Sequence, residues 1–405
     1  MIALEEARAR VLGLCRPLPE VAVPLAEALG CVTAEPVVSD ANVPSFATTA
    51  MDGYAVWAAD TEGASEAHPV RLLVISTIAA GAAPDRPVGR GQAARIMTGA
   101  PMPEGADGIA IVEVTATDGD HVLVHQPSVA GVAVRLPGGD IVRGQEVFPA
   151  GTVLSPGHLG VLASIGLEKV VVYRRARVGV LSTGDELAEG SEALRPGQIR
   201  DTNRLTLMSL CRQSGFEVLD LGKARDDEDV IREVMSRGAE SCDAVITSGG
   251  VSMGDFDFVK KVLDQIGEMS WMQVAIRPAK PLAFGTVGGT PVFGLPGNPV
   301  SSMVSFELFA RPGLRQMMGF TGTYLDRLRV RGVTDDGFAR KPDGKLYLNR
   351  VVAKASDEDG RFHVHSAGGQ ESHLLRAMAL ANALALVPDG DGIPPGGDVD
   401  LLLLE

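Results

Sequence analysis

Glycine, hydroxyl and carboxylate residues gather where a short apolar run ends, in "DAVITSGGVSMGDFDFVKKVL" (243–263). Ser248, Gly249 and Gly250 follow the apolar residues, and Asp257 precedes an expected helix. Glycines at the end of a strand let backbone N–H groups approach a ligand, and such groups bind oxyanions. A carboxylate at the same place would repel an anion unless a hard divalent cation such as Mg²⁺ lies between them. The pattern therefore predicts a metal-assisted phosphoanhydride or oxyanion enzyme.

Two further segments share this pattern. They are "VGVLSTGDEL" (178–187) and "PVFGLPGNPVSS" (291–302), and each is expected to leave an apolar strand into glycine with serine or threonine and then to enter a helix. In an open parallel sheet, ligands bind beyond the carboxyl ends of the strands. We therefore expect the three strand exits to line one edge of one sheet.

Charged residues near these exits could bind a metal and an anion. Asp257 and Asp226 are candidate ligands for Mg²⁺, which takes one or two carboxylates and completes its shell with waters and phosphate oxygens. Arg277 and Lys280 lie in "AIRPAKPLAFG" and could take the charge of an anion directly, lysine as a point charge and arginine as a fork.

Ordinary structural roles are an alternative for the same residues. Residues 183–186 match a capping box, in which Glu186 would satisfy backbone donors and contact no ligand. Asp257 could be an acid of a first helical turn, where the macrodipole favours it by roughly 0.3–1 kcal/mol. Arg277 and Lys280 could be a surface basic pair.

Composition and missing motifs disfavour several functional classes. The chain has neither G-x-x-x-x-G-K-[ST] nor G-x-G-x-x-G, so a P-loop ATPase and a dinucleotide-binding enzyme are not indicated. A net charge of −14 and an aromatic share of 4% argue against nucleic acid. The cysteines form no C-x-x-C pair, no apolar run approaches the length of a membrane span, and the first residues do not resemble a signal peptide. We expect a cytoplasmic protein with no nucleic-acid or membrane partner.

The elements that must position the strand exits alternate between strand and helix from about residue 176 onward. Such alternation predicts a central doubly wound, mostly parallel α/β domain within a multidomain α/β plus β fold. An N-terminal helical and β-rich region and a small C-terminal β-barrel are expected to flank it. Helices are expected at 2–15, 21–29, 155–166 and 299–318, and the segment "DANVPSFATTAMDGYAV" (40–56) is expected to be a loop. The predicted domains are a linking domain (1–45 and 146–175), a β-rich domain carrying the MDGYA loop (46–145), the α/β domain (176–320) and the barrel (321–405).

At these residues the sequence resembles a known family, the molybdopterin molybdenumtransferases (the MoeA proteins and the E domain of gephyrin). The resemblance covers nearly the whole chain. The motifs that carry it occur in family order, and they are "PSFATTAMDGYAV", "IMTGAPMPEGAD", "STGDEL", "GQIRDTNR", "TSGGVSMGDFDFVK", "RPAKPLAFG", "GLPGNPVSS" and "GGQESHLL".

The resemblance implies a role in molybdenum cofactor biosynthesis. Such proteins are homodimers that take adenylylated molybdopterin, cleave its phosphoanhydride with release of AMP, and insert molybdate. Mg²⁺ is the implied cation. The adenylyltransferase of the preceding step and molybdoenzyme acceptors are candidate partners. Whether molybdate or tungstate is the physiological oxyanion is left open, because both are tetrahedral dianions of similar size.

The resemblance also implies a set of site residues. Asp52 would reach into the cleft of the partner subunit, and Lys280 would act with Ser301 on molybdate. The implied catalytic residues are Asp52, Glu186, Asp226, Asp257 and Lys280, of which Glu186, Asp226 and Asp257 would bind the metal. The implied substrate-binding residues are Ser182, Thr183, Gly184, Asp201, Asn203, Ser248, Gly249, Gly250, Ser252, Arg277, Pro281, Pro296, Gly297, Asn298, Ser301, Arg350 and Ser372.

The sequence departs from the family pattern at two places, and two other functions stay open. Arg277 stands where the family usually has lysine in Lys-Pro-Gly-Lys-Pro, and arginine keeps the charge but not the geometry. Gly139 stands where the usual Gly-Glu-Asp-Ile has glutamate, so we assign no catalysis to it. One alternative function is the preceding adenylylation of molybdopterin, and the other is a non-catalytic pterin carrier or scaffold.

Overall fold

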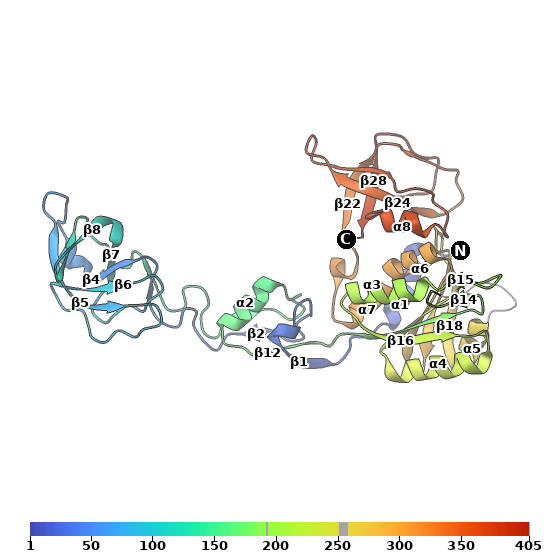
Figure 1. Ribbon diagram of the computed structural model, residues 1–405, viewed down its shortest axis with the longest axis horizontal. Coiled ribbons are helices and arrows are strands. Elements are labelled where there is room, and N and C mark those ends of the chain that lie inside the picture. Colours follow the sequence, from blue (N-terminus) through green and yellow to red (C-terminus); the bar gives the residue numbers. More distant parts are fainter. Residues whose placement is uncertain (192, 251–257, 405) are drawn as a thin grey trace. The chain divides into compact units, whose positions relative to one another are not determined.

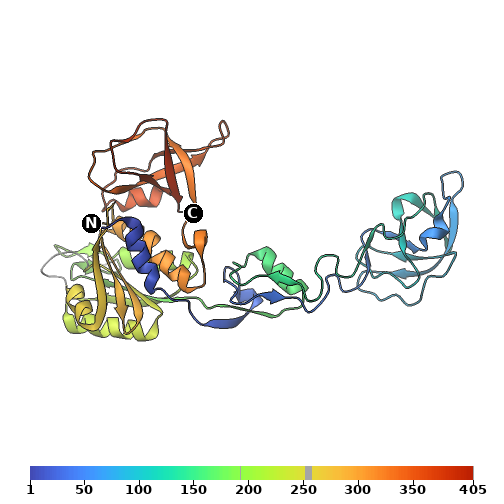
Figure 2. The ribbon, with the colours of Figure 1, turned by 180° about the vertical axis from the view of Figure 1, so that it is seen from behind.

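The structure, a computed structural model, describes residues 1–191, 193–250 and 258–404. Its chain divides into two units, which are drawn in Figures 1 and 2. Unit 1 consists of Met1–Ala22, Gly30–Ala34 and Val171–Glu405, and unit 2 consists of Val23–Leu29 and Glu35–Val170. The finer division into four domains stays a prediction.

Unit 1 is built on a six-stranded sheet with the order β16-β13-β17-β21-β20-β18. The first four strands of this order are parallel and the last two are antiparallel to their neighbours, which confirms the predicted mostly parallel sheet. The strands are β13 (Arg177–Thr183), β16 (Glu217–Ala224), β17 (Ala244–Ser248), β18 (Gly267–Gln273), β20 (Pro281–Val287) and β21 (Thr290–Leu295). β13 and β17 are buried along nearly their whole length, as expected of parallel strands covered on both faces.

Helices cover both faces of this sheet (Figures 1 and 2). One face carries α4 (Glu228–Ser241) and α5 (Phe258–Ile266), whose apolar stripes join the core through residues such as Ile231 and Val259. The other face carries α1 (Leu4–Leu14), α3 (Asn203–Gln213), α6 (Pro299–Ser305) and α7 (Arg311–Met317). A π-helical turn, Phe306–Ala310, joins α6 to α7, so the helix predicted at 299–318 is continuous but locally widened.

The strand order reverses between β13 and β17. From β13 the chain passes through α3 to β16 on one side, and then through α4 to β17 on the other side. The carboxyl ends of β13 and β17 therefore flank the topological switch point, which is where doubly wound sheets bind their ligands.

The C-terminal part of unit 1 confirms the predicted small β-barrel. Five strands follow the cyclic order β24-β25-β22-β28-β26, and pairing of β26 with β24 closes it. They are β22 (Arg329–Thr334), β24 (Leu346–Ala355), β25 (Phe362–Ser366), β26 (Ala383–Val387) and β28 (Gly397–Leu403). The short strand β19 (Ile276–Arg277) pairs with β24 and so attaches the "RPAKP" segment to the barrel. Beside the barrel lie α8 (Leu375–Leu380) and the pair β23 (Phe338–Ala339) and β27 (Gly392–Ile393).

Two barrel histidines, His363 and His365, each pair with carboxylates. Asp335 lies 2.7 Å from His363 Nδ1, and Asp359 lies 3.1 Å from its Nε2. Hydrogen bonds from Asp335 and then Asp359 raise the pKa of His363. Because the folded pKa is raised, this contribution to stability is complete below the pKa of an unfolded histidine, about 6.5, and is lost as pH rises through the folded value.

We predict that Asp335→Asn lowers the midpoint of the His363 titration, because it removes the first of these two carboxylates. Proton NMR of the His363 ring as a function of pH measures that midpoint. Asp391→Asn, at an exposed position, serves as the control and should leave the His363 midpoint unchanged. An unchanged His363 midpoint in Asp335→Asn would contradict the assignment of the shift to Asp335.

Unit 2 contains a second six-stranded sheet, with the order β7-β4-β6-β5-β9-β8. Its strands are β4 (Gly53–Val56), β5 (Val70–Ile78), β6 (Gln92–Ile96), β7 (Gly108–Ile111), β8 (Thr115–Asp118) and β9 (His121–Val124). The loop predicted at 40–56 is wrong at two places. Thr48–Thr49 form the short strand β3, and β4 pairs on both sides, with β6 and β7. Gly53 permits this, since a Cβ there would lie 2.3 Å from the Ala110 carbonyl oxygen.

The predicted helix at 21–29 is also wrong. The chain instead forms β1 (Glu20–Pro24), which pairs with β12 (Lys169–Tyr173), and then one 3₁₀ turn. Val21 and Val23 favour an extended backbone and Pro24 cannot donate within a helix, so local chemistry overrides the apolar spacing. The predicted helices at 2–15 and 155–166 are confirmed as α1 and α2 (Pro156–Ser164), the latter with Ser155 as N-cap.

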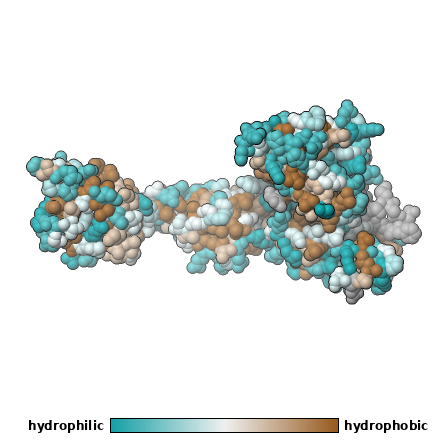
Figure 3. Space-filling model, turned by 45° about the horizontal axis from the view of Figure 1, so that its top comes forward, coloured by the Kyte–Doolittle hydropathy of each residue, from teal (hydrophilic) through white to brown (hydrophobic). Residues whose placement is uncertain are grey.

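Short strand pairs complete the fold, namely β2 (Val37–Val38) with β11 (Glu146–Phe148), β3 (Thr48–Thr49) with β10 (Val134–Arg135), and β14 (Leu187–Ala188) with β15 (Ile199–Arg200). Figure 3 shows that hydrophobic residues reach the surface among hydrophilic ones. No helix in the described residues is long and apolar enough to span a membrane.

Candidate functional site

The three strand exits meet at one cavity of about 280 Å³ in unit 1, which we call the strand-exit cavity. Residues from the ends of β13, β17 and β21 line it together, which confirms the predicted convergence. Predicted site residues in its wall are Ser182, Thr183, Glu186, Asp201, Asn203, Ser248, Gly249, Gly297 and Asn298.

Asn203, the first residue of α3, ties two of the exits together. Its Nδ2 donates to Ser248 Oγ at 2.8 Å and to the Gly297 carbonyl oxygen at 2.7 Å. Its Oδ1 is buried and accepts no hydrogen bond from the described part of the chain. Since Asn203 lines the cavity, this oxygen is an acceptor that a bound ligand could satisfy.

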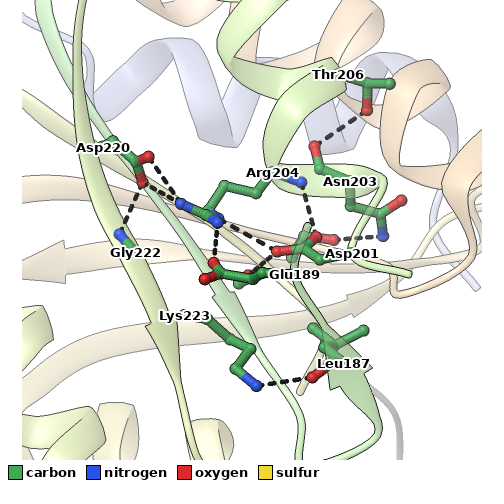
Figure 4. A network of polar contacts seen from close by, with 11 residues as sticks. Leu187, Glu189, Asp201, Asn203, Arg204, Thr206, Asp220, Gly222 and Lys223 are labelled. Atoms are coloured by element: carbon green, nitrogen blue, oxygen red, sulfur yellow. Dashed lines mark hydrogen bonds and ion pairs between the residues drawn. The ribbon is translucent and has the colours of Figure 1, made fainter. Parts of the chain in front are cut away.

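Ser182 and Asp201 are largely committed to each other and to Arg204. Ser182 Oγ donates to Asp201 Oδ2 at 2.5 Å, and the Asp201 side chain is only 3% exposed. Arg204 also binds Asp220 and Glu189, and Figure 4 shows its guanidinium among these carboxylates. Desolvation opposes ionisation of Asp220, but the hydrogen bonds from Arg204 and from the Gly222 backbone N–H, together with the nearby arginine charges, outweigh it and lower the pKa of Asp220. The network holds α3 against β16 and thereby fixes the wall of the cavity.

Glu186 is not part of a capping box. The exit of β13 leads into β14, and the next helix begins only at Asn203, so residues 183–186 precede no helix N-terminus. The expectation that each exit enters a helix directly is therefore wrong for β13. The Glu186 carboxylate instead lies against Gly184, where a Cβ would meet Glu186 Oε2 at 2.4 Å. Gly184 thus makes room for the carboxylate, and Glu186 lines the cavity.

Asp226 lies beside the same turn. Its Oδ2 accepts from the Asp185 backbone N–H and its own N–H donates to Asp185 Oδ1, both at 3.3 Å. The described residues contain no group of three or more His, Cys, Asp and Glu side chains arranged as a metal site. Asp257 and Ser252 lie outside the described residues. The hard oxygen donors of Glu186 and Asp226 fit Mg²⁺, which needs only one or two protein carboxylates.

A second cavity of about 420 Å³, which we call the RPAKP cavity, lies where the α/β sheet meets the barrel. Predicted site residues in its wall are Arg277, Lys280, Pro281, Pro296, Asn298, Ser301 and Ser372. Three cationic side chains face it, because Lys345 joins Arg277 and Lys280, and Glu371 is its only carboxylate among the described lining residues. Its charge therefore suits an anion.

Arg277 and Lys280, the two cations predicted to line this cavity, differ in whether their side chains already bind another residue of the protein. Arg277 Nη1 donates to the Tyr347 hydroxyl at 3.0 Å, and its guanidinium lies 5.1 Å from the centre of that ring. No carboxylate of the described chain pairs with the exposed Lys280 ammonium. Lys280 follows Ala279, which has φ +73°, a conformation that glycine adopts with less strain. Lys280 is thus the cation left free for a ligand.

Arg350 holds the loop that lines the RPAKP cavity and is not itself a lining residue. It is fully buried, and its Nη2 donates to the carbonyl oxygens of Gly369 (2.9 Å) and Glu371 (3.2 Å). Burial lowers the pKa of Arg350, and the nearby Glu371 opposes that effect. The structure therefore places Arg350 beneath the loop that carries Ser372.

The remaining predicted residues lie outside both cavities. Gly250 follows Gly249 but is not a lining residue. Asp52 belongs to unit 2, where its Oδ1 accepts from Thr98 N at 2.7 Å and from Thr98 Oγ1 at 2.8 Å. The backbone and then the hydroxyl of Thr98 lower the pKa of Asp52. The role of Asp52 across a subunit interface stays a prediction.

Among the residues of the cavity walls that residue-level reasoning from the sequence missed, three are basic. Lys345 and His373 come from the barrel, and Arg200 comes from β15. His373 lines both cavities. His373 lies in the motif "GGQESHLL", in which Ser372 is the predicted site residue.

Matches to known sequence families cover most of the chain. Residues 2–166 match the MoeA N-terminal region (domain I and II), residues 179–316 match the family described as "Probable molybdopterin binding domain", and residues 332–404 match the MoeA C-terminal region (domain IV). The α/β domain and its strand-exit cavity thus define a protein of the molybdopterin-binding domain class.

Relatives that match over nearly the whole chain show which family within this class the protein belongs to. The chain is 39% identical over 389 residues to molybdopterin molybdenumtransferase 2 of Mycobacterium tuberculosis, covering 94% of this chain and 93% of that protein. It is 36% identical to the molybdopterin molybdenumtransferase of Haemophilus influenzae over 98% of this chain and 97% of that one. The crystal structure of the molybdopterin biosynthesis MoeA protein of Pyrococcus horikoshii matches with a TM-score of 0.83 and 28% identity over 100% of both chains. The chain belongs to the molybdopterin molybdenumtransferase (MoeA) family.

Proposed function

We propose that this chain is a transferase of molybdenum cofactor biosynthesis that inserts molybdate into molybdopterin, as the names of its relatives indicate. In the full proposal the substrate is adenylylated molybdopterin, Mg²⁺ assists cleavage of its phosphoanhydride, and AMP is released. The observation that carries the proposal is the pair of cavities that share Asn298 and His373. One is built from glycine-rich strand exits and the other from cations, which suits a phosphate substrate beside an oxyanion.

The residues of the chain have distinct tasks in this proposal. Hydroxyl and amide groups of the strand-exit cavity, among them Thr183 and Asn203, bind and orient the nucleotide part of the substrate. Lys280 and Ser301 bind the oxyanion, with Ser372 presented from the barrel. Fixed donors of this kind stabilise charge that develops in the transition state without reorganising at the moment of reaction.

Glu186, Asp226 and Asp257 would hold the divalent cation. Bound there, Mg²⁺ would neutralise charge on the phosphoanhydride oxygens. The reciprocal contact of Asp226 with Asp185, the residue before Glu186, holds Asp226 beside the turn that carries Glu186. A homodimer, in which Asp52 of one protomer reaches the cleft of its partner, is part of the same proposal.

The two alternative functions differ in their support. The adenylyltransferase alternative is not favoured, because the match to the family extends over the N-terminal and C-terminal regions on both sides of the α/β domain. A purely structural scaffold would need neither cavity, so the exposed Lys280 in the wall of the RPAKP cavity favours a protein that binds an anion.

The proposed function is tested by following AMP release from adenylylated molybdopterin with Mg²⁺, with and without molybdate. The product is then added to a cofactor-free molybdoenzyme. We expect molybdate-dependent AMP release together with reconstituted activity. Binding of the nucleotide substrate without any cleavage would support the carrier, and consumption of ATP with release of pyrophosphate would support the adenylyltransferase.

We predict that Gly249→Ala weakens AMP binding about tenfold. Gly249 has φ +95°, and a Cβ there would lie 3.0 Å from the Thr183 carbonyl oxygen, inside the wall of the strand-exit cavity. The β13 and β17 exits must then move apart. Titration calorimetry with AMP measures the affinity, and about 1.4 kcal/mol corresponds to the tenfold change.

Gly222→Ala is the matched control for this prediction. Gly222 has φ +81°, so alanine meets the same backbone penalty, but a Cβ there contacts nothing within 4 Å. Equal losses of AMP affinity in both variants would show that backbone strain, and not the wall of the cavity, is responsible.

A further inference from the structure

His373 occupies the boundary between the two cavities. Of the described residues, only Asn298 and His373 line both the strand-exit cavity and the RPAKP cavity. Asn298 belongs to the α/β domain, whereas His373 is contributed by the barrel side of unit 1, in the loop between β25 and α8. A ligand that occupies both cavities at once must pass this residue.

The backbone around His373 is held from both sides. Arg350 binds the carbonyl oxygens of Gly369 and Glu371, as described above. On the other side the Val300 N–H, in the first turn of α6, donates to the Ser372 carbonyl oxygen at 3.1 Å. His373 is therefore placed by a buried arginine and by the helix that carries Ser301.

The His373 side chain contributes no polar contact to the fold of the described residues. In the part of the chain that the structure describes, its imidazole forms no hydrogen bond and no ion pair. The other two barrel histidines behave differently, because His363 pairs with Asp335 and Asp359, and His365 pairs with Asp335 and Asp336. A polar ring that lines two cavities without an internal partner is available to a ligand.

The charges that face His373 favour an anionic ligand on one side. The charged side chains of the RPAKP cavity are Arg277, Lys280, Lys345 and Glu371, and those of the strand-exit cavity are Glu186, Arg200 and Asp201. Asp201 is bound by Ser182 and Arg204, and Lys345 is bound by Asp343 at 2.6 Å. An imidazole N–H at this boundary would donate to an oxygen of a phosphate or of a tetrahedral oxyanion.

We propose that His373 is a substrate-contact residue that donates a hydrogen bond to anionic oxygen where the nucleotide and the oxyanion meet, so that one side chain serves both cavities. This inference rests on the proposed function for the identity of the two ligands. It assigns to the barrel a direct part in binding, in addition to its part in supporting the loop.

The test uses the full-length protein with AMP and with sodium molybdate as separate probes, measured by titration calorimetry. We expect His373→Ala to weaken the affinity for both probes about tenfold, since a hydrogen bond to a charged group is lost in each case. His373→Arg should restore part of both affinities, because guanidinium also donates to anionic oxygen. Since His373 is exposed, His373→Ala should leave thermal unfolding unchanged.

Two control variants distinguish a residue that contacts ligands in both cavities from one that contacts a ligand in a single cavity. Lys345→Met removes a residue that lines only the RPAKP cavity and should weaken molybdate binding alone. His365→Ala removes a barrel histidine that lines neither cavity and should change neither affinity.

Several outcomes would overturn the proposal. These are unchanged affinity for either probe in His373→Ala, loss in His373→Ala without recovery in His373→Arg, and failure of the wild-type protein to bind either probe. The proposed function fails separately. If the wild-type protein binds both probes and His373→Ala loses both, but adenylylated molybdopterin is never converted, the contact stands and the transferase reaction does not.

Discussion

Replacing Lys280 by methionine is expected to lower the rate of molybdenum transfer roughly 10²–10³-fold, the size of effect seen when one preorganised donor to a developing charge is removed. Methionine keeps most of the length and the apolar stem of lysine but removes the ammonium. Lys280 faces the RPAKP cavity and pairs with no carboxylate of the described chain. Its charge is therefore not committed elsewhere.

Arg277 is not expected to compensate for this loss. Its guanidinium is held by the Tyr347 ring and hydroxyl, and Lys345 is held by Asp343. Neither cation can move to the position of Lys280 without giving up an existing partner. The loss should therefore be close to the full value for a removed donor, and Arg277→Lys should not rescue it.

The measurement is the initial rate of AMP release and of cofactor formation for Lys280→Met at saturating nucleotide substrate. AMP binding should be retained, because Lys280 does not line the strand-exit cavity. Lys354→Met, on an exposed barrel position that lines neither cavity, is the matched control and should be as active as wild type. Transfer in Lys280→Met within a factor of three of wild type would remove Lys280 from the catalytic residues.

The sequence indicated the strand-exit cavity because its walls come from short, local signals. Each exit is one apolar strand followed by glycine and a hydroxyl residue, and parallel strands must end at one edge of the sheet. Local signals were also where the predictions failed. The spacing of Thr183 and Glu186 matches a capping box, but a capping box can form only at the N-terminus of a helix. In the structure these residues lead into β14, and no helix begins there.

The RPAKP cavity was harder to predict from the residues themselves, because its wall joins segments far apart in the chain. The pairing of β19 with β24 brings Arg277 next to Tyr347, and Val300 binds the loop of Ser372. The residues around 277 and 373 give no local signal for these contacts. The contact of Arg277 with Tyr347, the burial of Arg350 and the position of His373 in both cavities therefore became visible only in the structure. The resemblance supplied residue types, whereas the structure supplied their partners.

Glu307 lies in the π-helical turn that continues α6, the helix that carries Ser301 of the RPAKP cavity. Its side chain is 2% exposed and accepts two hydrogen bonds from Arg327, from Nε at 3.0 Å and from Nη2 at 3.1 Å. The Arg311 Nε lies 3.8 Å away. Burial lowers the pKa of Arg311, and Glu307 is the first of the nearby charges that oppose this effect.

Glu307→Gln is therefore expected to lower the free energy of unfolding by about 3–5 kcal/mol, because it leaves two arginines partly buried without their carboxylate. Glutamine keeps the shape of the side chain, so lost charge and not lost packing is responsible. In scanning calorimetry the transition that includes unit 1 should fall by roughly 6–20 °C. Glu233→Gln, at an exposed position of α4, should shift it by no more than a surface substitution does.

A double variant separates the pair from its surroundings. When Arg327→Met is added to Glu307→Gln, one of the two unpaired charges is also removed, and part of the lost stability should return. Strict additivity of the two single losses would mean that Glu307 and Arg327 do not stabilise each other, despite two hydrogen bonds between them. In that case this ion pair would not contribute to the stability of α6, the helix that begins after Asn298 and carries Ser301.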